Sequence, residues 1–333
     1  MAGNLSTWLF AGLIGSVGIA PWASGSILTV GASGTYTTIA DAWAAAASGD
    51  TIRFIDSGTY TSSATLNLNS KSNLTVESAS GQRATIDFAG GTAGFYVNAD
   101  GFTVQNLNLN TQGAADSIIT AASPPVGNSA TITNINFTRS VGTTGYGAHG
   151  LVQSADNMSI SYSTFKGVGD DTNEGRGVGI SWSVGTTLAV DHCSFDNFMI
   201  PINQGASSGT TDITVTNSAF GNWRPSGWAG GITTADSGAT GAEDYNASYG
   251  PMPLLVGPGV ITSGGHSFTV GSYSGIFAGD TSVGNWAVNP ALYTAAGDGT
   301  TIGAWQAVPE PTGLSLIALG AFAFAARRRR SNA

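Results

Sequence analysis

The chain has 333 residues, of which 48 are glycine and only 9% are charged. Its apolar content of 41% excludes a disordered chain. Glycine, serine, threonine and asparagine are weak helix formers that suit short strands and turns, so the composition favours an all-β protein. Residues 1–307 carry 7 Lys/Arg against 19 Asp/Glu, a balance of −12. This charge excludes an unspecific nucleic-acid binder.

An apolar stretch over residues 8–20 is followed by Pro21 and by small residues up to Gly25. This order is typical of a secretory signal, and we expect residues 1–25 to be a signal peptide cleaved near Gly25. No Lys or Arg precedes the stretch, since the first basic residue is Arg53. The alternative is a buried amino-terminal strand.

Residues 27–60 contain short strand-like segments, a helix-forming run over residues 41–47 and the sequence Gly49-Asp50-Thr51-Ile52. This order resembles the amino-terminal cap of the pectin lyase-like β-helix superfamily. The resemblance implies a helix over the open end of the coil and a first strand that opens at Gly49-Asp50-Thr51-Ile52. An exposed coil end invites edge-to-edge association, which gives such a cap a physical purpose.

Further along, five segments repeat one pattern, in which two apolar residues alternate with polar ones, a turn residue follows, and a large apolar residue comes three positions later. The second apolar residues, with a degenerate first copy, stand at positions 76, 104, 132, 160, 190 and 215, at spacings of 28, 28, 28, 30 and 25. Alternation with period two indicates a strand with one buried face, and so short a unit must stack on its neighbours. The sequence therefore predicts a single-stranded right-handed parallel β-helix over residues 26–306, with clear coils over about residues 74–223 and degenerate cap coils on either side.

Stacking of the coils places corresponding residues in rows. The turn position forms one row, Asn106, Asn134, Tyr162, His192 and Asn217, in which asparagine suits a left-handed turn and stacked amides can bond along the axis. The large apolar position forms an inward row, Leu109, Phe137, Phe165, Phe195 and Phe220.

The longest repeat carries the densest charge cluster of the body, within residues 167–177. Asp170, Asp171 and Glu174 could ligate Ca²⁺, a hard ion that takes several oxygen ligands. Outward positions nearby offer Lys166, Asp191, His192 and Asp196, and such a group could run β-elimination on a uronate or hydrolysis with two carboxylates. On this hypothesis the catalytic candidates are Asp171, Glu174, Arg176, Asp191, His192 and Lys166.

The alternative for residues 167–177 is a solvated loop in which Arg176 pairs with an acid, because no complete calcium motif is present. His192 occupies a turn position otherwise held by Asn or Tyr, which favours a structural role. Trp182, Trp223 and Trp228 could stack on sugar rings or pack in the core and caps. Cys193 is the only cysteine, which excludes an intrachain disulfide and indicates an inert core residue.

Near the end of the chain, Asp244-Tyr245-Asn246 and residues 298–305 resemble the last coils of the pectin lyase-like superfamily. This resemblance, which covers about residues 27–306, implies the fold but no activity, because the fold hosts lyases, hydrolases, esterases, adhesins and inert scaffolds.

The tail, residues 307–333, contains Pro309, Glu310 and Pro311, then 13 apolar or small residues over 314–326, then Arg327, Arg328, Arg329 and Arg330. Thirteen helical residues span about 20 Å, short of the roughly 30 Å hydrocarbon core, although arginine side chains can snorkel and mark the cytoplasmic side. The order resembles the PEP-CTERM tail of certain Gram-negative bacteria. The resemblance implies export, a transmembrane helix, an exosortase partner that recognises Pro309, Glu310 and Pro311, and an organism that makes exopolysaccharide. A plain tail anchor is the alternative.

Three hypotheses for function follow. The first is an exported, noncatalytic protein of the cell envelope or extracellular matrix that associates with polysaccharide, anchored at least transiently through its tail. The second is a polysaccharide lyase or glycoside hydrolase, with Ca²⁺ as the one candidate cofactor. The third is a surface adhesin.

Overall fold

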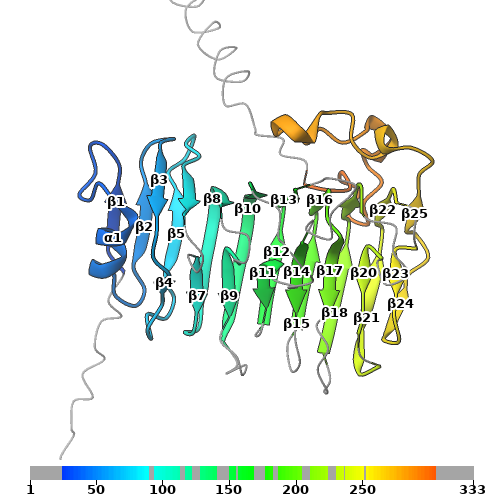
Figure 1. Cartoon of the computed structure of the whole chain (residues 1–333), viewed down its shortest axis with the longest axis horizontal. Coiled ribbons are helices and arrows are strands. Elements are labelled where there is room, and N and C mark those ends of the chain that lie inside the picture. Colours follow the sequence, from blue (N-terminus) through cyan, green and yellow to red (C-terminus); the bar gives the residue numbers. More distant parts are fainter. Residues whose placement is uncertain are drawn as a thin grey trace, which may run out of the picture.

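The structure is a computed structural model that describes residues 25–89, 94–112, 117–121, 128–140, 150–154, 157–168, 177–182, 187–204, 211–223, 230–235, 237–250 and 253–304. Within these residues the chain winds into a parallel β-helix, with one short helix at its amino-terminal end (Figure 1). The predicted all-β parallel β-helix is therefore confirmed.

Each coil contributes strands to three parallel stacks. The first stack contains β1 (Ile27–Val30), β2 (Thr51–Phe54), β5 (Thr75–Ser78), β8 (Phe102–Thr111), β10 (Ser129–Arg139), β12 (Asn157–Ser161), β15 (Thr187–Asp191), β18 (Thr211–Thr216), β21 (Ala239–Asp244) and β24 (Val260–Ser263). The second contains β3 (Thr59–Ser62), β6 (Thr85–Phe88), β13 (Thr164–Lys166), β16 (Ser194–Asp196), β19 (Ala219–Phe220), β22 (Ala247–Ser248) and β25 (Phe268–Thr269), and joins the first through the long strands β8 and β10. The third contains β4 (Leu66–Asn67), β7 (Phe95–Val97), β9 (Ile119–Ala121), β11 (Gly150–Ser154), β14 (Val178–Trp182), β17 (Ile200–Gln204), β20 (Ile232–Thr233) and β23 (Leu255–Val256).

The strand register confirms the predicted repeat. Val104 pairs with Ile132, Ile132 with Ile160, and Ile160 with Val190 in successive coils. Residues about 28 positions apart in sequence are thus lateral neighbours, at the strand spacing of about 4.8 Å. All four side chains are buried, so the repeated apolar residues form one continuous core.

Both predicted rows are present. Phe165 stacks between Phe137 and Phe195, with ring centroids 4.6 and 4.7 Å away, and Phe195 stacks on Phe220 at 5.1 Å. The turn row has φ between 48° and 59° at Asn106, Asn134, Tyr162, His192, Asn217 and Tyr245. The side-chain amide of Asn134 donates to that of Asn106 at 2.7 Å, as expected for stacked amides.

Helix α1 (Ile39–Ala45) closes the amino-terminal end of the β-helix. The side chain of Thr38 caps it by accepting from the Asp41 amide, and the backbone is extended at Ala46, so the helix begins and ends two residues before the predicted range. Its buried Trp43 packs against Phe95 at 5.6 Å and against Phe102 at 6.5 Å.

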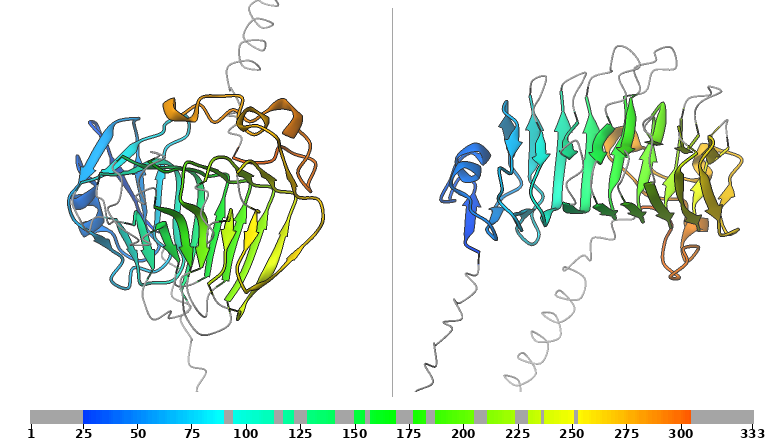
Figure 2. Two further views of the ribbon diagram at one scale, coloured as in Figure 1. Left: turned by 45° about the vertical axis from the view of Figure 1, so that its right-hand side comes forward. Right: turned by 90° about the horizontal axis from the view of Figure 1, so that it is seen from below.

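Residues 270–304, which we call the strap, turn back along the outer side of the later coils (Figure 2). The strap contains the short helices η2 (Tyr273–Gly275), η3 (Thr281–Val283) and η4 (Pro290–Leu292). Its apolar residues form a second buried cluster with the outer side of the coils: Ala219, Ala247, Ile276, Phe277, Val288, Leu292, Ala296 and Ile302.

The expectation that residues 298–305 form a last coil is wrong for the described part, residues 298–304. The amide of Gly303 donates to the Asn217 carbonyl at 2.7 Å, and the amide of Ala304 donates to the Ser194 hydroxyl at 2.9 Å. These bonds hold the segment across the side of two earlier coils instead of beside β24.

Candidate functional site

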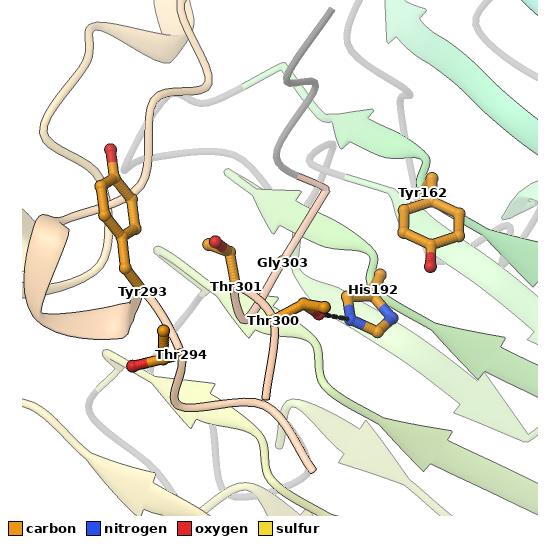
Figure 3. Close-up of a pocket in the computed structure, with 7 residues that line it drawn as sticks. All are labelled: Tyr162, His192, Tyr293, Thr294, Thr300, Thr301 and Gly303. Atoms are coloured by element: carbon orange, nitrogen blue, oxygen red, sulfur yellow. Dashed lines mark hydrogen bonds between the residues drawn. The ribbon is translucent and has the colours of Figure 1, made fainter. Parts of the chain in front are cut away.

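The strap encloses a hollow of about 430 Å³ against the turn row, lined by Tyr162, His192, Tyr293, Thr294, Thr300, Thr301 and Gly303 (Figure 3). The β-helix contributes Tyr162 and His192 from successive coils, and the strap contributes the rest. Tyr162 is 45% exposed and Tyr293 is 40% exposed. Two partly exposed aromatic side chains, one from the β-helix and one from the strap, therefore line the same hollow.

His192 joins the β-helix to the strap, and its side chain is only 3% exposed. Its Nδ1 lies 2.8 Å from Asp191 Oδ2, and its Nε2 lies 2.7 Å from the Thr300 hydroxyl oxygen. Its ring stacks on Tyr162 with a centroid distance of 4.9 Å. The Thr300 hydroxyl also donates to Asp298 at 2.6 Å. Both ring nitrogens are thus occupied.

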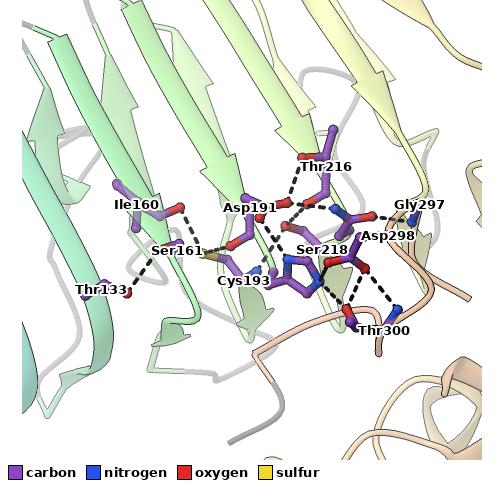
Figure 4. Close-up of polar contacts among 12 residues, drawn as sticks. Thr133, Ile160, Ser161, Asp191, Cys193, Thr216, Ser218, Gly297, Asp298 and Thr300 are labelled. Atoms are coloured by element: carbon purple, nitrogen blue, oxygen red, sulfur yellow. Dashed lines mark hydrogen bonds and ion pairs between the residues drawn. The ribbon is translucent and has the colours of Figure 1, made fainter. Parts of the chain in front are cut away.

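Asp191 is the centre of the polar network in Figure 4. Besides His192, it accepts hydrogen bonds of 2.8 Å from the Thr216 hydroxyl and from the Asn217 side-chain amide. Burial raises the pKa of this carboxyl, but the hydrogen bonds from His192, Asn217 and Thr216 outweigh burial and hold the pKa below its ordinary value. Asp191 is therefore a bonded carboxylate that stabilises the turns of two coils.

Lys166 and Asp196 form a second cluster, beyond the turn on β13 and β16. They are register partners, and both bond the strap. The Lys166 ammonium donates to the Thr281 carbonyl at 2.6 Å, and burial lowers its pKa. Asp196 accepts from the hydroxyls of Tyr273 at 2.9 Å and Thr281 at 2.5 Å.

The predicted catalytic group is therefore divided. Asp191 immediately precedes the turn and His192 occupies it, whereas Lys166 and Asp196 follow it. The strap contacts the first pair through Thr300 and the second pair through Thr281. These two pairs do not form one set of free side chains, because the strap bonds His192 of the first pair and both members of the second. The remaining candidates, Asp170, Asp171, Glu174 and Arg176, lie outside the described residues.

Cys193 and Trp223 belong to the core. Burial is the main cause that raises the pKa of the Cys193 thiol to about 12, which makes it an unreactive group. Trp223 is 1% exposed and cannot present its ring to a sugar in this structure. Trp228 and the side chain of Trp182 lie outside the described residues.

Within the described residues, no group of three or more His, Cys, Asp or Glu side chains is placed to hold a metal ion. The Ca²⁺ ligands proposed from sequence, Asp170, Asp171 and Glu174, lie outside this part of the chain. Likewise, none of the helices described here has the length and hydropathy needed to cross a membrane. The apolar segment over 314–326 is not among them.

The strap residues that line the hollow had no signal in the repeat. Thr300 and Asp298 lie within the segment 298–305, whose sequence resembles a coil. Tyr293 and Thr281 lie in a stretch without periodicity, so the repeat does not predict their positions.

Comparison with known proteins identifies the tail. Residues 307–330 match the model of the PEP-CTERM protein-sorting motif. None of the curated proteins matches the chain. Among solved structures, the crystal structure of the pectate lyase Pel9A is similar, with 14% identity, a TM-score of 0.39 and coverage of 85% of this chain and 96% of that chain.

The fold and the tail define an exported parallel β-helix protein that is sorted to the cell surface. The predicted PEP-CTERM motif, with Pro309, Glu310, Pro311 and the four arginines, is confirmed by the match over residues 307–330. The motif indicates membrane anchoring during sorting and processing by an exosortase. Residues 1–25, the expected signal peptide, lie outside the described part except for Gly25.

Proposed function

We propose that this protein is a noncatalytic component of the cell surface or matrix that binds polysaccharide through the hollow between the turn row and the strap. The observation that carries the proposal is the pairing of two exposed tyrosines with threonine hydroxyls in one concave site. The apolar face of a sugar ring packs on an aromatic ring, and its hydroxyls exchange hydrogen bonds with groups such as Thr294 and Thr301.

The charge around the hollow favours a neutral glycan. Asp191 and Asp298 flank His192, and the side chain of Asp298 is 47% exposed. The body of the chain carries 7 Lys/Arg against 19 Asp/Glu over residues 1–307. A polyuronate would meet repulsion there, whereas a neutral chain would not.

The state of the acidic side chains supports binding without cleavage. A general acid or base must reach the proton that it transfers. Both oxygens of Asp191 and of Asp196 already accept hydrogen bonds from the protein. These carboxylates stabilise the strap and the turns. The hollow between them is therefore suited to binding a glycan without cleaving it.

The test is a binding and turnover assay with the full chain in mild detergent and a panel of neutral and acidic glycans, with and without Ca²⁺. Tyr162→Asn retains a residue type found at the same turn position and removes the ring. We expect this variant, and Tyr293→Ala, to weaken binding of a neutral glycan by about two- to tenfold, the value of one lost ring contact. Tyr96→Ala, on β7 in the third stack, is the matched control and should bind normally.

Two results would overturn the proposal. Shortened or unsaturated products that disappear in Asp171→Ala or Arg176→Ala would establish the lyase or hydrolase hypothesis. Equal glycan binding by the parent, Tyr162→Asn and Tyr293→Ala would exclude the hollow as the binding site.

A further inference from the structure

The two ends of the β-helix differ in how they are closed. At the amino-terminal end, α1 covers the core, and residues 31–36 fold back on β1 with bonds from Tyr36 N to Thr29 O and from Gly31 N to Tyr36 O. At the other end, the strap leaves after β25 and runs along the side (Figure 1). In the described part of the chain, β23, β24 and β25 each pair only with the preceding coil.

The last coil, residues 253–269, is correspondingly exposed. None of its residues is buried, although the coil before it contains fully buried Ala239 and Ala247. Val260 is 66% exposed and Phe268 is 40% exposed, and Leu255 and Ile261 are only partly buried against the core. Apolar side chains and unpaired strand edges thus coincide on one surface.

This surface is also almost free of charge. Residues 253–269 include no Asp, Glu, Lys or Arg, in a chain whose formal charge is −9. The one titratable side chain, that of His266, contacts Asp244 of the preceding coil at 3.0 Å. Two copies of such an end can approach without the repulsion that the rest of the surface would produce.

We propose that the last coil, residues 253–269, is a self-association surface through which two copies of this chain join end to end. The strand edges of an open coil end are best covered by a partner whose own strand edges are arranged in the same way. The same end of a second copy supplies them, while the closed amino-terminal end does not. Two copies can meet about a two-fold axis so that their cores align end to end. β24 of one copy then runs antiparallel to β24 of the other, and the unpaired backbone N–H and C=O groups of the two strands can bond. Because only one end is open, the product is a closed dimer and not a filament.

The experiment measures the mass of the full chain in mild detergent by sedimentation or light scattering over a range of protein concentrations. The parent chain should be dimeric. Val260→Lys combined with Phe268→Lys places charge on the edge, as natural edge strands do, and should weaken dimerisation at least about tenfold. Ile27→Lys is the matched control, because Ile27 is 51% exposed on β1 at the closed end. That control should remain a dimer.

Crosslinking provides a second measurement that does not depend on the lysine variants. Thr262→Cys on β24 should form a disulfide-linked dimer under mild oxidation. Thr214→Cys, in the same outward row two coils earlier, should not. A monomer at all concentrations would overturn the proposal. So would a dimer that survives the double lysine substitution, since the contact would then lie elsewhere, for example in the tail.

Discussion

Replacement of His192 tests whether this side chain fastens the strap to the β-helix. We choose His192→Asn because Asn occupies the same left-handed turn position in the coils at 106, 134 and 217, so the backbone is not strained. The substitution removes the 2.7 Å contact to Thr300 and the ring stack on Tyr162. It also weakens the contact to Asp191, which keeps its bonds to Thr216 and Asn217.

The expected loss can be estimated from these contacts. A neutral hydrogen bond contributes about 0.5–1.5 kcal/mol, a bond to a charged group about 1.5–3 kcal/mol, and an aromatic pair about 0.5–1.5 kcal/mol. Because the bond to Asp191 is lost only in part, we expect the free energy of unfolding to fall by about 2–4 kcal/mol.

His266→Asn is the matched control. His266 also stacks on a tyrosine, Tyr245, at 4.3 Å and contacts Asp244, but its side chain is 57% exposed. Its loss should cost less than about 1 kcal/mol, since exposed pairs contribute little. Denaturant unfolding gives the free energies, and hydrogen exchange of residues 297–304 reports release of the strap. Equal losses in the two variants, or an unchanged exchange rate in His192→Asn, would refute the role assigned to His192.

Three further predictions concern the core, the polar network and the thiol. Phe165→Ala removes the middle ring of the stack and should lower the free energy of unfolding by about 3–5 kcal/mol, measured with denaturant; a loss below about 1 kcal/mol would mean that the stack can collapse around the gap. The folded-state pKa of Asp191 lies below its ordinary value, so its stabilisation is present above the unfolded-state pKa of about 3.9 and is lost as the pH falls through the folded value. The acid-induced loss of stability should therefore be smaller in Asp191→Asn than in the parent, and identical pH profiles would contradict this origin. Cys193 should resist a thiol reagent at pH 8 in the folded chain and react after denaturation; modification of folded protein would show that the core opens.

The regular part of the fold could be predicted because one constraint recurs in every coil. Phe137, Phe165 and Phe195 must enter the same core, so they recur at nearly equal spacing and their stacking follows. The clear repeat ends with the coil of Val215, because the next coil, expected as a degenerate cap coil, has Gly241 and Glu243 where earlier coils have apolar residues. The structure pairs them with Ile213 and Val215. The Glu243 carboxylate is accommodated by the amide of Asn246 at 3.0 Å and by the Ser267 hydroxyl.

The candidate site could be predicted only on the side of the β-helix. The repeat placed Tyr162 and His192 in one outward row, and the structure confirms this position. Their partners Tyr293 and Thr300 lie in the strap, and Thr300 is 108 positions from His192. A contact that occurs once, between residues so far apart in sequence, produces no repeat in the sequence. The spacing of residues therefore predicted neither the hollow nor the hydrogen bonds of Lys166 and Asp196 to the strap.

The path of the strap has a consequence for how the protein sits on the cell. Ala304 is bonded to Ser194 on β16, and β19, β22 and β25 still follow in that stack. The sorting motif begins at residue 307, and three residues extend the chain by at most about 10 Å. The tether therefore departs from the flank of the rod and not from its last coil, so an anchored molecule is held by its side.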